Sequence, residues 1–530
     1  MSMIGNLAVE LAGKTLGEAL EYHAANNGDL PALLHESRTL SWSELDEEVN
    51  RVAELLASRG VVKGDVVGFM MSKRPELVVG FFACGKLGAV MAPVNFKLHP
   101  DHIRDQFKTG DIRTLFLEKT HDKILHSLLP ILPDPKRIFY VGEAGSNGEG
   151  SYSESDALLG ELPDVQVAIE DTVYLNYTSG TTGQPKGAVT SHRSIMFNGL
   201  TAFDRAGPDG EKIDGLGFDE THRFMSMFSV FAHPHEIFHR SILCGGAFIV
   251  LDTLSPRVTA ATIERFGVSW MMAVPSFYEM LLDHANADNT DISSLRILES
   301  GGAYVSADTL ERLELQFSAS FMPVWGSTET TGVAVAMRAD RPRVLGTTGK
   351  PVAGYEVRIV DTHGRDCAVG ETGEMIVRGE GVVSEYLNNK EETEALFVDG
   401  WYHTRDLMQW TDDGFIQFVG RRSEMLKIGG IRVYPLEIEK VLKDHPEVRD
   451  VVVVRAEERI RGEVARAVVQ VVKGSEISAR QLRQYCKGRL AVYKIPRIIE
   501  FWSEVPKLPN GKVNKHAVVA VGVDAKRDER

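Results

Sequence analysis

The sequence predicts an α/β protein with a large N-terminal body of several subdomains and a small α+β domain at the C-terminus. Three observations predict this division. Helical and strand patterns alternate over the first 160 residues, short strands separated by Gly and Asp turns occupy residues 345–381, and the periodicity changes again after Gly420. Repeated strand and helix units form sheets covered by helices, whereas runs of short strands form a β subdomain. We therefore expect domains at residues 1–422 and 423–530.

The composition is that of an ordinary folded protein, because 43% of the 530 residues are hydrophobic and 25% are charged. The four cysteines are far apart in the chain and form no CxxC pair, so neither a disulfide framework nor a thiolate zinc site is expected. The opening segment MSMIGNLAVELAGK has no basic stretch before a long apolar one, and the apolar stretch 78–94 is interrupted by Lys86. We expect no export signal, no membrane span and a cytoplasmic location.

The first elements follow from local patterns. Apolar residues recur at helical spacing within residues 41–60, where Ser41 and Glu44 can form a capping box. The next segment, VVKGDVVGFMM at 61–71, predicts a strand, and residues 75–87 predict a second helix.

Two later segments have simpler patterns. Residues 142–156 are polar and rich in glycine, which predicts a surface loop. In the β region, residues 356–360 and 374–377 alternate apolar and polar side chains and are expected to be strands.

The C-terminal domain differs from the body in charge. Residues 431–530 carry 21 Lys and Arg against 14 Asp and Glu, although the whole chain has a net charge of −15. Pro435 is placed to begin a helix, residues 451–455 and 465–472 predict strands, and residues 478–490 predict another helix. An acidic body with a basic domain argues against general nucleic-acid binding and suits a lid that meets a polyphosphate, although a chance imbalance of surface charge would look the same.

A phosphate-binding loop is predicted where an apolar strand at 173–177 runs into TSGTTGQPKG at 178–187. Its glycines let backbone N–H groups point towards one place, its hydroxyls add donors, and its lysine adds a positive charge. Gly187 follows the lysine, so the Ser or Thr of a Walker A loop is missing. An exposed Gly/Ser/Thr linker is the alternative. The residues expected to bind ATP here are Thr178, Ser179, Gly180, Thr181, Thr182, Gly183 and Lys186.

The segment YTSGTTGQPKG at 177–187 resembles the signature of the acyl-adenylate-forming superfamily, which includes acyl-CoA synthetases, stand-alone adenylation domains and beetle luciferases. Further motifs of that superfamily follow in order over most of the chain: SGGA at 300–303, WGSTE at 325–329, GETGEMIVRG at 370–379, WYHTRD at 401–406, GRRSEMLKIGGIRVYPLEIE at 420–439 and LPNGK at 508–512. The resemblance implies a two-step ligase. A carboxylate attacks the α-phosphorus of MgATP to give acyl-AMP and pyrophosphate, and the thiolate of coenzyme A then displaces AMP.

The resemblance also assigns an adenine site. It places Trp325 and Gly326 along the adenine, because an aromatic ring can stack on the base while a glycine lets the backbone pass close to it. Gly301, Gly302 and Ala303 are expected to form the opposite wall.

Further roles follow for the ribose, the metal and the chemistry. Asp406 and Arg421 are expected to bind the ribose hydroxyls, and Glu329 is a hard carboxylate ligand for Mg²⁺. Thr328, Glu329 and Lys512 are assigned to catalysis. A flexible ammonium such as that of Lys512 can bridge the carboxylate oxygen and the α-phosphate as negative charge builds.

The superfamily rotates its C-terminal domain between the two steps, so the resemblance implies that this domain is mobile. Rotation would bring Lys512 to the site for adenylation and Lys427, Gly429 and Gly430 to it for coenzyme A. Three positions in this chain depart from the family pattern. Ser423 stands at the hinge where Asp or Lys is usual, Arg405 replaces the customary Gly, and Ser229 replaces an aromatic or His gate.

The acid substrate is expected to be a fatty or aromatic monocarboxylate. Three candidate pocket segments, at 228–233, 273–278 and 330–335, are mostly apolar and contain no Lys or Arg to hold a second carboxylate.

The expected partners are this acid, ATP and coenzyme A, and no nucleic acid is expected. The sequence leaves open whether the protein forms a homodimer. The main alternative is an adenylation enzyme that loads a carrier-protein thiol. A luciferase-like oxygenase and a nucleotide-binding regulator without chemistry are more distant alternatives.

One motif points to a different class of enzyme. His235, Glu236 and His239 spell HExxH, in which two histidines on one helical face bind Zn²⁺ and the glutamate acts as a base. Only three positions are fixed, Ile242 stands where the longer signature requires Gly, and no third ligand motif follows. We therefore expect a structural role for this motif, with a zinc peptidase as the alternative.

Overall fold

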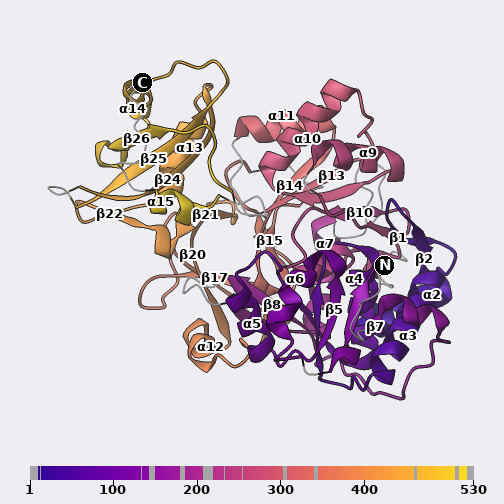
Figure 1. Ribbon diagram of the computed structural model, residues 1–530. Coiled ribbons are helices and arrows are strands. Elements are labelled where there is room, and N and C mark those ends of the chain that lie inside the picture. Colours follow the sequence, from indigo (N-terminus) through magenta and orange to yellow (C-terminus); the bar gives the residue numbers. More distant parts are fainter. Residues whose placement is uncertain are drawn as a thin grey trace.

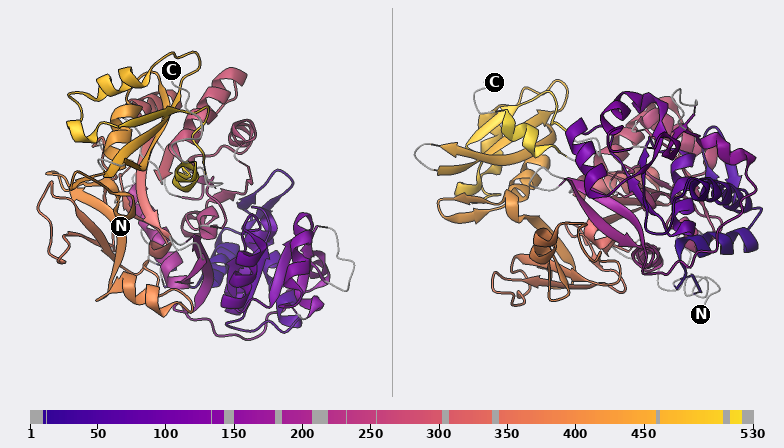
Figure 2. Two further views of the ribbon diagram at one scale, coloured as in Figure 1. Left: turned by 60° about the vertical axis from the view of Figure 1, so that its left-hand side comes forward. Right: turned by 60° about the horizontal axis from the view of Figure 1, so that its bottom comes forward.

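The protein folds into a large α/β body with a smaller C-terminal domain beside it (Figure 1). The body contains a seven-stranded sheet, a nine-stranded sheet and a small antiparallel sheet. In both views of Figure 2 the small sheet and the C-terminal domain lie at the same end of the molecule, away from the first helices. The computed structural model describes residues 10–11, 13–132, 134–142, 150–179, 185–206, 219–231, 233–253, 255–301, 307–338, 344–458, 462–507 and 513–521.

The seven-stranded sheet is parallel except for its last pair, β8 and β9. Val67 and Phe69 belong to the core cluster of two helices, α3 and α4, whereas Met70 belongs to that of α5 and α6. Both faces are therefore buried, which explains the continuous apolar run of this strand. In spatial order the strands are β7 (Gly150–Ser151), β6 (Ile138–Val141), β5 (Thr114–Glu118), β3 (Val66–Met70), β4 (Val90–Pro93), β8 (Thr172–Ser179) and β9 (Pro185–Ser191), and the helices are α3 (Trp42–Ser58), α4 (Pro75–Leu87), α5 (Pro100–Thr109) and α6 (Asp122–Leu128).

The nine-stranded sheet has a parallel centre and antiparallel edges. Met271 and Leu298 lie in the cluster formed with α9, α10 and α11, whereas Trp270 and Ile297 lie in the cluster that reaches the small sheet. In spatial order the strands are β16 (Lys350–Pro351), β15 (Gly332–Ala336), β14 (Ser320–Ser327), β13 (Ile297–Gly301), β12 (Trp270–Ala273), β10 (Arg223–Ser226), β11 (Ala247–Ile249), β1 (Pro31–Leu34) and β2 (Thr39–Ser41). The remaining helices of the body's first part are α2 (Leu16–Asn26), α7 (His192–Ala206), α8 (Ser241–Cys244), α9 (Pro256–Phe266), α10 (Pro275–Asp288) and α11 (Ala307–Phe317).

The small sheet confirms the predicted β subdomain. It is antiparallel throughout, and its long strand β20 pairs with β18, β19 and β21. Its strands are β17 (Glu356–Val360), β18 (Gly373–Arg378), β19 (Phe397–Val398), β20 (Trp401–Trp410) and β21 (Ile416–Arg421), and α12 (Lys390–Leu396) lies beside β19 and β20.

The C-terminal domain is an α+β unit with its own core. Ile438 and Leu442 on α13 pack with Val453 on β24, with Ala467 on β25 and with Leu482 on α14. The helix predicted at residues 478–490 ends early, at Cys486. Among the described helices of the whole chain, none has the length and apolar character that crossing a bilayer requires. The domain contains β22 (Leu426–Ile428), β23 (Ile431–Val433), β24 (Val448–Glu458), β25 (Gly462–Val471), β26 (Ile498–Phe501), α13 (Pro435–Lys443), α14 (Ala479–Cys486) and α15 (Lys515–Ala520).

Local predictions agree with the structure where they depend on neighbours along the chain. The capping box of Ser41 and Glu44 is present, and the helix at Pro75–Leu87 has its predicted bounds. The prediction of a loop over 142–156 is wrong in its second half, because Gly150 pairs with Phe139 as an edge strand and a 3-10 helix follows. The part at 143–149 lies outside the described residues.

Candidate active site

Glu329 lies at a sharp reversal between β14 and β15. The intervening residues Thr328–Thr330 form one turn of 3-10 helix. Gly326 is required here, because a Cβ at this position would come within 2.1 Å of the carbonyl oxygen of Gly332 on the returning strand. This close approach places Glu329 in the interior, where its side chain is buried.

Two tyrosines hold the buried carboxylate of Glu329. The Tyr386 hydroxyl donates to Oε1 at 2.5 Å, and the Tyr402 hydroxyl donates to Oε2 at 3.0 Å. Burial, and then the nearby Glu329 charge, raise the pKa of both phenols, so they stay protonated and keep donating. Neither tyrosine was among the residues predicted for the site. Tyr402 lies within WYHTRD and could have been noticed there, whereas Tyr386 lies in none of the motifs.

Asp406 joins two residues that the sequence assigns to the nucleotide. The indole Nε1 of Trp325 donates to Oδ2 of Asp406 at 2.9 Å, and Nε of Arg421 lies 3.3 Å from Oδ1. Asp406 and Arg421 face each other directly on β20 and β21. The structure therefore brings together the residues predicted for adenine and ribose.

Lys186 of the predicted phosphate loop reaches the same region. It lies opposite Thr178 where β9 pairs with β8, and its side chain is buried. Its Nζ lies 2.8 Å from Oε1 of Glu392 on α12 and 5.9 Å from the centre of the Tyr386 ring, whose hydroxyl holds Glu329. The predicted phosphate and metal residues are thus adjacent.

The structure describes the remaining predicted residues of the nucleotide site incompletely. Gly301 ends β13 beside Val324 of β14, and its place on the wall opposite Trp325 stays a prediction. Lys507 and Val513, which flank the LPNGK segment, pair with each other. Thr178 and Ser179 end β8. Gly180, Thr181, Thr182, Gly183, Gly302, Ala303 and Lys512 lie outside the described residues.

The residues predicted for coenzyme A lie on a separate element. Lys427 is exposed on β22, and Gly429 and Gly430 form the turn to β23 with φ of 58° and 82°. A two-residue hairpin turn with positive φ at both positions favours glycine. Ser423 is exposed in the short 3-10 helix that links β21 to this hairpin. The predicted hinge residue therefore stands two positions after Arg421, the predicted nucleotide residue on β21.

The side chains of the HExxH motif are buried and make hydrogen bonds or ion pairs within the protein. The motif begins on a short 3-10 helix rather than on an α-helix, and the ring centres of His235 and His239 lie 5.1 Å apart. The ring nitrogens of His235 lie 2.9 Å from the Tyr174 hydroxyl and 3.0 Å from the carbonyl oxygen of Thr331. His239 contacts the carbonyl of His235. Among the residues that the structure describes, no three His, Cys, Asp or Glu side chains form a group that could hold a metal ion.

The glutamate of this motif belongs to a buried ion cluster. Arg240 lies 2.5 Å from Glu236 and 2.7 Å from Glu299, and all three side chains are buried. Although burial alone would raise it, the Arg240 charge holds the pKa of Glu236 well below its usual range. Trp270 donates to the second oxygen of Glu299 at 2.8 Å, and Phe224 faces the guanidinium at 4.5 Å. This cluster accounts for the motif as a structural feature.

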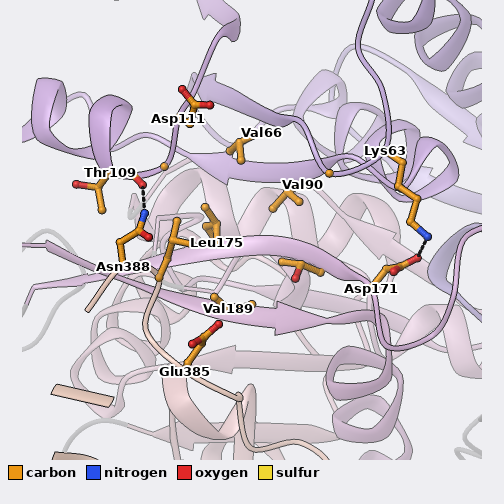
Figure 3. Close-up of a pocket in the computed structure, with 15 residues that line it drawn as sticks. Lys63, Val66, Val90, Thr109, Asp111, Asp171, Leu175, Val189, Glu385 and Asn388 are labelled. Atoms are coloured by element: carbon orange, nitrogen blue, oxygen red, sulfur yellow. Dashed lines mark hydrogen bonds and ion pairs between the residues drawn. The ribbon is translucent and has the colours of Figure 1, made fainter. Parts of the chain in front are cut away.

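A separate pocket of about 410 Å³ opens on the surface beside the segment that carries Tyr386 (Figure 3). Glu385 and Leu387 line it, whereas Tyr386 between them contacts Glu329. Lys63 and Asp171 form an ion pair of 2.6 Å at its side. None of the predicted site residues lines this pocket, so the candidate site is the cluster around Glu329, Lys186 and Asp406.

Comparisons with known proteins place the chain in a family. The AMP-binding enzyme family matches residues 20–387, and its C-terminal domain family matches residues 437–512. The boundary predicted near residue 422 falls between these matches and stays a prediction.

Individual relatives match along nearly their whole length. The chain is 30% identical to a feruloyl-CoA synthase of Amycolatopsis sp over 488 residues, which cover 92% of this chain and 95% of the relative. It is also 30% identical to an indoleacetate–CoA ligase of Aromatoleum aromaticum, over 95% and 97% of the two chains. The crystal structure of the anthranilate CoA ligase AuaEII in complex with anthranoyl-AMP superposes with a TM-score of 0.88 at 27% identity, over 97% and 98% of the chains. These matches confirm the resemblance seen in the sequence motifs, and the chain belongs to the AMP-binding enzyme family.

Proposed function

We propose that this protein is an ATP-dependent acid–CoA ligase. It activates a monocarboxylate as acyl-AMP with release of pyrophosphate, and then transfers the acyl group to coenzyme A. The observation that carries the proposal is the convergence of a buried carboxylate, Glu329, with the phosphate-loop Lys186 and the Asp406 and Arg421 pair. Relatives named as CoA ligases over almost the whole chain support it.

The nucleotide is proposed to lie along β14 and β20. Asp406 has a carboxylate that can accept both ribose hydroxyls, and Arg421 can donate to them. Trp325 would border the adenine from a position fixed by its hydrogen bond to Asp406. The phosphates would then point towards Lys186, because Lys186 shares the carboxylate of Glu392 with Arg405, the residue before Asp406.

Glu329 fits a role as a magnesium ligand. Each of its oxygens accepts one phenol hydrogen, which fixes the carboxylate and leaves lone pairs for a hard cation. A bound Mg²⁺ would neutralise charge on the ATP phosphates. Tyr386 and Tyr402 would hold the ligand at a fixed orientation, as hydrogen bonds to metal ligands generally do.

The acid is proposed to be a monocarboxylate with an apolar alkyl or aryl body. Two of the predicted pocket segments, 273–278 and 330–335, are largely buried, with Phe277 on α10 and Val333 and Val335 on β15. An interior of this kind accepts a hydrophobic acid and opposes a second carboxylate. The names of the aryl-acid relatives favour an aryl group.

A panel assay tests this function. The protein is incubated with MgATP and a series of alkyl and aryl carboxylates, with either hydroxylamine or coenzyme A as acceptor. The proposal expects hydroxamate with the first acceptor and acyl-CoA with the second. Hydroxamate without acyl-CoA would instead favour transfer to a carrier-protein thiol. The absence of both products over the whole panel would contradict the proposed chemistry.

Glu329→Gln is expected to raise the Mg²⁺ concentration needed for half-maximal pyrophosphate release by at least about tenfold, because a neutral amide is a poor ligand for a hard cation. Carboxylate-dependent pyrophosphate release is measured against Mg²⁺ for both proteins. Glu391→Gln, at an exposed position on α12, removes the same charge and should leave the curve unchanged. A Glu329→Gln curve that coincides with the wild-type curve at limiting Mg²⁺ would refute the metal assignment.

A further inference from the structure

Glu392 lies between two cations from different parts of the chain. Its Oε1 is 2.8 Å from Nζ of Lys186 on β9 and 3.2 Å from Nη1 of Arg405 on β20. Since both groups contact the same oxygen, they are no more than about 6 Å apart. The hydrogen bond from Lys186 is the main reason that the pKa of Glu392 is lowered, so the carboxylate is ionised at neutral pH. One carboxylate therefore neutralises one of two neighbouring positive charges.

The backbone of Arg405 is in an unfavourable conformation. Its φ is 59°, in the left-handed region that costs free energy for any residue with a Cβ. This explains why a glycine is customary at the position. The Arg405 N–H donates to Glu374 at 3.0 Å, which holds the backbone in this conformation. Strain that a glycine would relieve is often retained for the sake of a side chain at a functional site.

Arg405 also lies at a specific place relative to the nucleotide residues. It directly precedes Asp406 on the same strand, and its guanidinium reaches towards Lys186. It is therefore positioned between the residue proposed for the ribose and the lysine proposed for the terminal phosphates. Its side chain is 44% exposed, so an anion can reach it.

We propose that Arg405 is a second phosphate-binding cation that acts beside Lys186 on the β- and γ-phosphates of ATP. Glu392 is the counter-ion that pairs with both cations before the nucleotide arrives, and the polyphosphate replaces it. This inference rests on the proposed function, and it adds a contact that the family's usual glycine could not make. Arginine suits the role because its planar fork can bind two phosphate oxygens together.

Equilibrium binding of ATP, pyrophosphate and AMP tests this proposal, with calorimetric titration of wild type, Arg405→Gly and Arg405→Gln. Both variants should bind ATP and pyrophosphate about tenfold more weakly, which is the scale of one charge-assisted hydrogen bond. AMP lacks the β- and γ-phosphates, so its affinity should change less than about twofold. Arg358→Gln is the charge control, because Arg358 has similar exposure and pairs with one carboxylate, Asp366, elsewhere on the small sheet.

Thermal unfolding separates binding from a structural role. Arg405→Gly should have a higher unfolding midpoint than Arg405→Gln, because only glycine relieves the left-handed backbone. Asp399→Gly, at another exposed position with positive φ, is the matched backbone control. A glycine variant that is more stable and yet binds pyrophosphate more weakly cannot be explained by damage to the fold.

Glu392→Gln tests the counter-ion. Removing the competing charge should tighten pyrophosphate binding by roughly fivefold, the scale of a partly exposed ion pair. Wild-type affinity for pyrophosphate in both Arg405 variants, in a protein that still forms acyl-AMP, would overturn the inference and leave the proposed function standing. Equal weakening of AMP and ATP would also overturn it, since the contact would then not be to the outer phosphates. A wild-type protein that binds neither ATP nor pyrophosphate would refute both the role of Arg405 and the proposed function.

Discussion

Lys512→Ala is expected to slow acyl-AMP formation by about 100-fold or more, which is the scale of losing one preorganised electrostatic contact in a transition state. The ammonium is proposed to meet charge that develops only while the acyl–phosphate bond forms. Thioester formation from supplied acyl-AMP should therefore survive. The first step is measured as carboxylate-dependent exchange of labelled pyrophosphate into ATP, and the second as acyl-CoA formed from synthetic acyl-AMP.

Lys512 itself lies outside the described residues, but the residues on either side of its segment are described. Lys507 and Val513 pair on either side of its segment, Lys507 lies 3.3 Å from Asp450, and Lys515 lies 2.6 Å from Glu424. The described residues on both sides of this segment thus contact the C-terminal domain. Lys473→Ala, at an exposed turn of the same domain, is the control for the loss of one charge.

Ser423→Pro is the counterpart of Lys512→Ala. Proline fixes φ but is tolerated in the first turn of a helix, where Ser423 lies, so the adenylation arrangement should form. The rotation proposed for the second step would change the backbone angles at this position, so it should fail in this variant. Equal losses in both half-reactions for both variants would show that the two steps do not depend on different parts of the C-terminal domain.

The second large effect concerns stability. Arg240→Met is expected to lower the free energy of unfolding by about 3–5 kcal/mol, because it leaves the carboxylates of Glu236 and Glu299 buried without a counter-ion. Urea unfolding followed by tryptophan fluorescence measures the change. The exposed pair of Arg358 and Asp366 gives the comparison, and Arg358→Met should cost less than about 1 kcal/mol.

A triple variant distinguishes loss of charge balance from loss of packing. Adding Glu236→Gln and Glu299→Gln to Arg240→Met removes both unpaired charges, so much of the lost stability should return. A single Arg240→Met variant as stable as the wild type would contradict the cluster's proposed contribution. A triple variant no more stable than the single one would show that packing around Phe224 and Trp270 matters more than charge.

The local parts of the fold could be predicted because they depend on residues close together in the chain. Helical spacing and a capping box set the start of α3, and proline followed by an apolar run set α4. The short strand at Gly150 was not predicted, because it forms by pairing with a strand that is separate in sequence and has no apolar pattern of its own. The same reasoning applies to the pairing of β1 with β11, which comes much later in the chain, whereas its other neighbour, β2, follows it closely.

The ordered local motifs were enough to indicate the family, and they singled out Glu329, Lys186 and Asp406 as candidate site residues. The residues that hold Glu329 became visible only in the folded protein. Tyr386 lies 57 residues from Glu329 and Tyr402 lies 73 residues from it, and no local pattern links such distant residues. HExxH likewise matches a zinc motif in sequence, but the buried Arg240 pairs with its glutamate. A buried charge needs a partner wherever the fold can supply one, and that partner is fixed by the packing of distant elements rather than by neighbours in the chain.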